Sequence, residues 1–89
     1  MTFDFDPAKN VKNLAKHGVS LLEADHFEWE TAAIREDTRK AYAEQRFEAT
    51  GLIGERLFVM VYCLRKSAFR IISLRKANTR EVKRYVTEN

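Results

Sequence analysis

Several side chains of the sequence are of types that can transfer a proton or hold a phosphate. They are His17, Glu44, Arg46, Arg70, Arg75, Arg80, Glu81 and Tyr85. RNA cleavage needs little more, because the ribose 2′-OH is itself the nucleophile. A protein has only to help remove its proton, stabilise the pentavalent phosphate and protonate the leaving 5′-oxygen. Arginine suits the second task, since its fork of donors grips two phosphate oxygens and stays charged. The same residue types also fit a module that binds nucleic acid or a partner without cleaving it.

The candidates for proton transfer each have a second, structural interpretation. His17 falls at the predicted end of a helix, where the dipole favours its charged form, yet a helix-capping or surface histidine is the commoner role for this residue type. Glu44 and Arg46 lie on one face of a predicted strand, either as an exposed ion pair or as an acid beside a phosphate grip. Tyr85 falls in an apolar stripe, which is more typical of a core residue. Residue types alone leave these alternatives open.

The arginines near the C-terminus raise a question of geometry. Side chains alternate between the faces of a regular strand, so Arg70 and Arg75 project from opposite faces unless a bulge intervenes. One of the two is then structural. Arg80 and Arg84 are four residues apart on the predicted last helix, where they either bind phosphate or only keep that side of the helix solvated.

Basic residues are concentrated in the last third of the chain. Residues 65–84 include eight lysines and arginines and one acid, whereas residues 23–36 are mostly acidic. This asymmetry indicates a face that binds polyanions and a separate acidic face, and a solvated surface without a ligand explains it equally well. Beyond the candidates above, we expect RNA contacts from Lys12, Lys16, Lys76, Lys83 and Arg84.

Length and composition exclude several classes of protein. The 89 residues fit a single domain, residues 1–89, since so short a chain has too few apolar residues to form two hydrophobic cores. Cys63 has no second cysteine to pair with and is expected to be a small buried hydrophobe. His17 and His26 are not at a helical metal-ligand spacing, and the sequence lacks a phosphate-binding glycine loop, so no metal or cofactor is expected. Without a secretory signal or an apolar run of membrane-spanning length, a cytoplasmic protein is expected.

Local signals predict three helices. Asp6 and Pro7 are typical of a helix start, the helix is expected to end near His17, and Gly18 supplies the left-handed residue that closes it. Residues 20–27 begin with a capping-box pattern and are expected to form a second, shorter helix. Residues 78–81 carry another capping box, which opens a helix at the C-terminus.

Three segments are predicted to be consecutive antiparallel strands. They are residues 46–53, 57–64 and 69–75, separated by turns at 54–56 and 65–67. The middle segment is nearly apolar throughout, as expected for a central strand covered on both faces. Residues 32–36 are a further candidate strand, followed by a charged loop at 37–40. The predicted fold is α+β: a small antiparallel sheet, a meander of three to four strands, flanked by two N-terminal helices and one C-terminal helix.

Taken in order, these segments resemble the BrnT family of bacterial type II toxin-antitoxin systems. The matching stretches are residues 5–9 (FDPAK), 13–20 (NLAKHGVS), 44–47 (EQRF) with Gly51, and 70–77 (RIISLRKA), leading to Arg80, Glu81 and Tyr85. The Lys-His-Gly and Arg-Ile-Ile-Ser blocks together are the specific part. The resemblance covers nearly the whole chain, with a poor match only at residues 29–42.

This resemblance implies a small toxin that arrests growth by cleaving RNA without a metal ion, on a fold distantly like that of RelE-type ribonucleases. By matched position it raises, without assigning roles, seven site residues: His17, Glu44, Arg46, Arg70, Arg75, Arg80 and Tyr85. It also implies an antitoxin, BrnA, with a ribbon-helix-helix DNA-binding part. That partner is expected to form a heteromeric 2:2 complex, to block the RNA-binding face and to repress the shared operon. Operator DNA would be contacted only through the antitoxin, and no membrane contact is expected.

Overall fold

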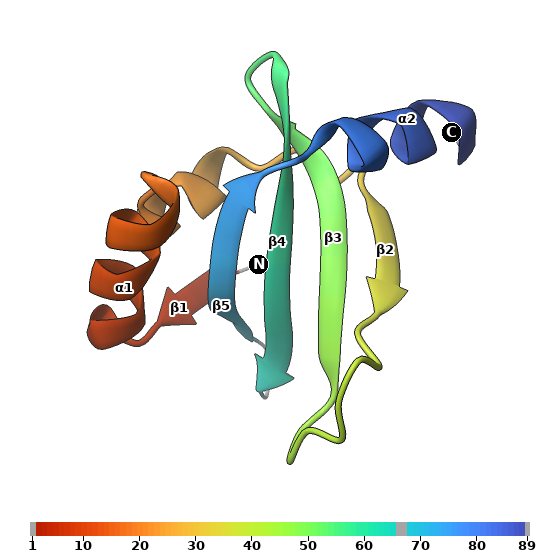
Figure 1. The fold of residues 1–89 in the computed structure, drawn as a ribbon. Helices are drawn as coiled ribbons and strands as arrows, with labels where there is room; N and C mark the ends of the chain where they lie inside the picture. Colours follow the sequence, from red (N-terminus) through yellow and green to blue (C-terminus); the bar gives the residue numbers. More distant parts are fainter. Residues whose placement is uncertain (1, 66–67, 89) are drawn as a thin grey trace.

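The sequence forms one five-stranded mixed sheet with three helical segments around it (Figure 1). The computed structural model describes residues 2–65 and 68–88. In chain order the elements are β1 (Thr2–Phe5), α1 (Pro7–His17), η1 (Leu21–His26), β2 (Ala33–Glu36), β3 (Arg46–Ile53), β4 (Arg56–Arg65), β5 (Ala68–Lys76) and α2 (Thr79–Glu88). The sheet order is β1-β5-β4-β3-β2, and every neighbouring pair is antiparallel except β1 with β5. The predicted α+β class is therefore confirmed.

The N-terminal strand β1 corrects the predicted sheet, which was a purely antiparallel meander of three to four strands. Phe3 and Phe5 alternate with Asp4, and the segment pairs in parallel with the beginning of β5. Such a pairing joins residues more than sixty positions apart, so it cannot be predicted from a turn signal in the local sequence. The predicted strands β3, β4 and β5 are present, with β4 in the centre as expected. The predicted turn at Lys66 and Ser67 lies outside the described residues.

The predicted helix ends are confirmed for α1. The Asp6 side chain accepts a hydrogen bond from the Ala8 N–H at 2.9 Å, Pro7 is the first helical residue, and Gly18 closes the helix at φ 70°. The second helix is shorter and tighter than expected. Residues Leu21–His26 form a 3-10 helix, η1, opened by the Ser20 hydroxyl. Six residues leave room for little more than one turn, which suits 3-10 geometry.

The core lies on one face of the sheet, beneath η1 and the chain on either side of it. Its buried members are Val19, Leu21, Ala24, Phe27, Ala49, Phe58, Met60, Tyr62, Ile71 and Leu74. Gly51 of β3 has no side chain because the Phe27 ring occupies that space: a Cβ there would lie 2.6 Å from the ring. The core therefore lies on one face of the sheet, and on the opposite face long polar side chains cover a few buried residues of the central strand β4.

Helix α1 lies along the edge of the sheet, beside the part of β5 that β1 does not cover (Figure 1). Its buried Asn13 satisfies backbone groups of β5 that have no neighbouring strand on this side. The Asn13 side chain donates to the carbonyl oxygens of Leu74 and Val19, both at 2.8 Å, and accepts from the Leu74 N–H at 3.1 Å. This anchor fixes the end of α1, and with it His17, against β5. No helix among residues 2–65 and 68–88 is long and apolar enough to cross a membrane.

Candidate functional site

A bulge in β5 brings the C-terminal arginines to one face of the sheet. Val61 of β4 is opposite Ser73, whereas the next residue, Tyr62, is opposite Ile71, so Ile72 has no partner. The extra residue shifts the alternation, and Arg70 and Arg75 both project from the polar face. Regular alternation would place the two arginines on opposite faces unless a bulge intervened. The bulge is present, so they share one face.

We call this polar side of the sheet the arginine face. Its cations are Arg35, Arg46, Arg70 and Arg75 from the strands, Arg39 from the loop after β2 and Arg84 from α2. Val59, Val61 and Cys63 of β4 form its floor and are buried beneath these long side chains. Acidic side chains lie between the arginines, so the face is a lattice of ion pairs with an excess of positive charge.

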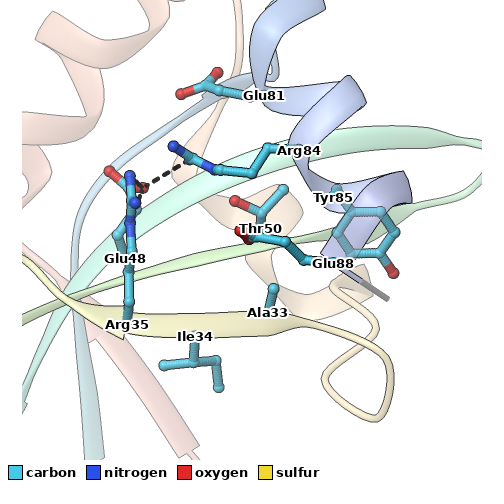
Figure 2. A pocket seen from close by; sticks show the side chains of 9 residues that line it. All are labelled: Ala33, Ile34, Arg35, Glu48, Thr50, Glu81, Arg84, Tyr85 and Glu88. Carbon is cyan, nitrogen blue, oxygen red and sulfur yellow. Dashed lines mark hydrogen bonds and ion pairs between the residues drawn. The ribbon is translucent and has the colours of Figure 1, made fainter.

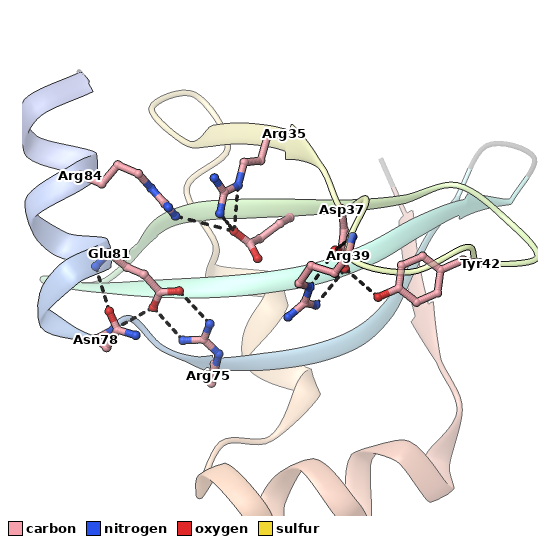
Figure 3. A network of polar contacts seen from close by, with 9 residues as sticks. Arg35, Asp37, Arg39, Tyr42, Arg75, Asn78, Glu81 and Arg84 are labelled. Carbon is pink, nitrogen blue, oxygen red and sulfur yellow. Dashed lines mark hydrogen bonds and ion pairs between the residues drawn. The ribbon is translucent and has the colours of Figure 1, made fainter.

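At the end of the face beneath α2, which we call the α2 end, Arg75 is held by Glu81. Both oxygens of the buried Glu81 carboxylate accept from Arg75, each at 2.8 Å (Figure 3). The Asn78 N–H also donates to Glu81, and Asn78 Oδ1 accepts from the Glu81 N–H, so the predicted capping box has formed. The Arg75 hydrogen bonds lower the pKa of Glu81 to about 2, and the same contacts raise the pKa of Arg75. Glu81 thus joins the start of α2 to β5.

A second buried carboxylate, Glu48, lies in the middle of β3 at the same end. It accepts from Arg35 at 3.0 and 3.2 Å, and Nη2 of Arg84 approaches it from α2 at 3.9 Å (Figure 2). The third carboxylate, Asp37, follows β2 and accepts a two-pronged contact from Arg39 at 2.8 and 2.9 Å (Figure 3). Those bonds lower the pKa of Asp37 to about 2. Each buried acid therefore orients at least one guanidinium that is more exposed than itself.

The opposite end of the face, which we call the open end, is arranged differently. Arg46 and Arg70 flank Cys63 in one row across β3, β4 and β5. Arg70 contacts the exposed Asp4 at 3.4 Å, and Glu44 pairs with Arg65 at 2.8 Å. Of the two alternatives for Glu44 and Arg46, the ion pair between them is not formed: Glu44 precedes β3, and its carboxylate pairs with Arg65 instead. Cys63 is buried in the floor, as expected.

His17 lies at the side of the arginine face, where α1 ends beside the bulge. It lines a hollow together with Ile72 and Ser73 of β5, and two of the expected RNA contacts, Lys12 and Lys16, line the same hollow. Burial lowers the pKa of His17, and the charges of Lys16 and Arg75 lower it further. Its imidazole is thus biased toward the neutral form, which can accept a proton, and not toward the charged form expected from its place at the end of a helix.

The remaining predicted residues are on or beside α2. Tyr85 does not enter the core: its hydroxyl donates to the Thr31 carbonyl oxygen at 2.8 Å, which ties α2 to the chain before β2. Arg80 and Lys83 are exposed on the helix, and Lys76 is exposed at the end of β5. Among the described residues no three His, Cys, Asp or Glu side chains gather where they could hold a metal ion.

Four members of the arginine face were not predicted: Arg35, Asp37, Arg39 and Glu48. Strand alternation offered a signal for two of them. In β3 the polar residues Arg46, Glu48 and Thr50 alternate with apolar ones, and in β2 Arg35 follows the apolar Ile34. The charged loop at 37–40 was recognised, but its docking over the sheet depends on tertiary contacts. Together the face offers fixed guanidinium groups for a polyanion and, beside one of them, an imidazole whose pKa is lowered by burial and by the nearby positive charges.

Comparisons with known proteins identify the family of this chain. A family model described as the ribonuclease toxin BrnT of type II toxin-antitoxin systems matches residues 5–81. The crystal structure of the Brucella abortus ribonuclease toxin BrnT is similar with a TM-score of 0.69 and 25% sequence identity, over 89% of this chain and 99% of that one. No curated protein sequence matches the chain. Because the family model spans most of its length, the chain belongs to the BrnT family of ribonuclease toxins of type II toxin-antitoxin systems.

Proposed function

We propose that this ribonuclease cleaves RNA at the α2 end of the arginine face, between Arg75 and His17. The observation that carries the proposal is the bulge at Ile72, because it turns Arg75 toward the side of the sheet on which α1 presents His17. A phosphate over Arg75 would then have a proton acceptor next to it.

Arg75 keeps a free pair of donors despite its contact with Glu81. A guanidinium has five N–H donors. Three of them are used: one Nη1 hydrogen by Glu81, the other by the Lys76 carbonyl oxygen, and one Nη2 hydrogen by Glu81. Nε–H and the second Nη2–H have no acceptor in the part of the chain that the structure describes, and they form the edge that can grip two phosphate oxygens. Glu81 therefore fixes the guanidinium without occupying this edge.

In the proposed reaction the neutral His17 imidazole accepts the proton of the ribose 2′-OH. The 2′-oxygen then bonds to phosphorus, the bond from phosphorus to the 5′-oxygen breaks, and the leaving oxygen takes a proton from solvent. Arg75 stabilises the extra charge on the pentavalent phosphate. The products carry a 2′,3′-cyclic phosphate and a 5′-OH. The lysines beside His17 would attract the RNA backbone.

The finer description of the partner is also part of this proposal. A type II family implies an antitoxin. We propose a BrnA-like protein that covers the arginine face in a 2:2 complex. In that complex only the antitoxin would contact operator DNA. A cytoplasmic location would give the toxin access to its RNA. The positive charge of the face supports binding of an RNA or of an acidic surface on the antitoxin.

The test is cleavage of a labelled oligoribonucleotide by the purified protein, with and without ribosomes. Cyclic-phosphate products from wild type, a loss in His17→Ala and Arg75→Ala, and an unchanged rate in Arg56→Ala are expected. Arg56 is an exposed arginine in the hairpin between β3 and β4 and serves as the charge-matched control. RNA left intact by folded wild-type protein under both conditions would refute the proposal, and equal loss in the Arg56 control would refute the assigned site.

A further inference from the structure

Arg46 differs from every other arginine of the arginine face. The other five each contact a carboxylate, whereas within residues 2–65 and 68–88 Arg46 contacts none. Its guanidinium carbon lies 4.2 Å from the centroid of the Tyr42 ring, and its buried Nε has no hydrogen-bond partner. Stacking on an aromatic ring holds the guanidinium plane but satisfies none of its N–H donors. Arg46 is therefore a cation that an aromatic ring positions and that no carboxylate among the described residues neutralises.

Arg70 provides a second cation in the same row. Arg46 is opposite Cys63 in β4, and Cys63 is opposite Arg70 in β5, so the two arginine Cα atoms are separated by two strand spacings, about 10 Å. Long side chains on the same face can converge across that gap. Among the described residues the one carboxylate that Arg70 pairs with is the exposed Asp4, and an exposed pair of this kind is easily replaced by a stronger anion.

The distance from Arg46 and Arg70 to Arg75 indicates how far along a bound RNA the two arginines would lie from the cleaved bond. Arg75 is opposite Val59, four residues along β4 from Cys63, which corresponds to about 13 Å. One strand of double-helical DNA advances about 3.4 Å along the helix axis per nucleotide, and a similar rise is taken for the bound RNA strand. Given cleavage beside Arg75 as proposed above, we propose that Arg46 and Arg70 form a second phosphate subsite, which binds an RNA phosphate roughly four nucleotides from the cleaved bond. The substrate would then run along β4, from the α2 end to the open end.

The length of the substrate tests this subsite. We would measure kcat/KM for oligoribonucleotides that share one cleavage site and extend from it by two or by six nucleotides, on each side in turn. For wild type we expect the longer extension on one side to raise kcat/KM by about 10- to 100-fold, the range for charged hydrogen bonds. In Arg46→Gln this ratio of long to short substrate should collapse toward one, whereas the Arg56→Gln control keeps it.

Several outcomes would overturn the subsite. Equal kcat/KM for short and long substrates in wild type would do so, as would an equal loss on both lengths in Arg46→Gln. Thermal unfolding of Arg46→Gln shows whether the variant is folded, and Arg70→Gln provides an independent second variant.

Binding separates this inference from the proposed cleavage. Non-cleavable 2′-O-methyl oligonucleotides of the same lengths would be titrated against wild type and both variants by fluorescence anisotropy. A length-dependent gain in affinity that Arg46→Gln removes supports the subsite even if no RNA is cleaved. An affinity independent of length, or one that both arginine variants leave unchanged, refutes the subsite even if cleavage beside Arg75 is demonstrated.

Discussion

The two ends of the arginine face hold their cations by different means. At the α2 end the side chains of Glu48 and Glu81 are 10% and 11% exposed, and they hold Arg35 and Arg75. At the open end Arg65 and Arg70 are held by Glu44 and Asp4, with 38% and 58% of their side chains exposed. The buried Asp37, whose N–H donates to the Arg46 carbonyl oxygen, holds Arg39, which reaches toward Glu48. A buried carboxylate loses little of its attraction to solvent screening, so the arginines that it holds are fixed before a ligand arrives. The comparison indicates that the α2 end is preorganised for chemistry and the open end for exchangeable binding.

The largest expected effect comes from changing the shape of a cation without its charge. Arg75→Lys should lower kcat of RNA cleavage by about 100-fold or more, because a lysine cannot present the paired donors that stabilise the phosphorane. Arg70→Lys at the open end should cost much less, since a point charge still attracts a phosphate. Steady-state kinetics on one oligoribonucleotide checks both. Similar losses in the two variants would abolish the distinction between the ends.

Removal of one carboxylate from each end compares their contributions to stability. Glu81→Gln should lower the free energy of unfolding by about 1–3 kcal/mol, because Arg75 loses a charged partner in a partly buried setting. Glu44→Gln removes an exposed pair and should leave the unfolding curve essentially unchanged. Urea denaturation followed by circular dichroism measures the difference. A larger loss in Glu44→Gln would show that the open end is the more tightly held.

The pH dependence of stability should follow the same comparison. The pKa of Glu81 is about 2 in the folded protein against 4.5 for a free glutamate. The stability that this lowered pKa contributes is present in full above about pH 4.5 and is lost as the pH falls toward 2. Thermal melts between about pH 2 and about pH 7 should therefore show a shallower loss of stability toward acid in Glu81→Gln than in wild type. Parallel curves for the two proteins would contradict the assignment.

The titration of His17 tests its proximity to Arg75. Because burial, Lys16 and Arg75 all lower the His17 pKa, a proton NMR titration should place it below 6.5 in wild type. Removal of one positive charge in Arg75→Gln should raise that pKa, and the more distant change Arg56→Gln should not. An unchanged His17 pKa in Arg75→Gln would show that the imidazole does not lie close enough to Arg75 to form the proposed site.

The smallest effect is expected at the margin of the α2 end. Lys12→Gln should weaken RNA binding at every sequence and reduce the slope of log affinity against log salt by about one, as for a single phosphate contact. Anisotropy titrations at several salt concentrations measure this slope. An unaltered slope would show that Lys12 only solvates α1.

Local sequence signals determined the elements of this protein. Asp6, Pro7 and Gly18 set the limits of α1 because caps and left-handed closures depend on a few neighbouring residues. The apolar run in β4 likewise indicated the central strand, and the capping box at Asn78 marked the start of α2. These patterns, with the Lys-His-Gly and Arg-Ile-Ile-Ser blocks, were sufficient for the α+β class and the family.

The tertiary structure decided which side chains share a site. The bulge at Ile72 reverses the facing of half of β5, and no residue in that strand announces it. The parallel pairing of β1 and the docking of Arg39 near Glu48 and Arg75 likewise join distant segments. Glu44 and Arg46, close in sequence, take separate partners because one precedes the strand and the other lies within it. Register and long-range packing depend on the summed energy of the whole sheet, so they cannot be read from local spacing.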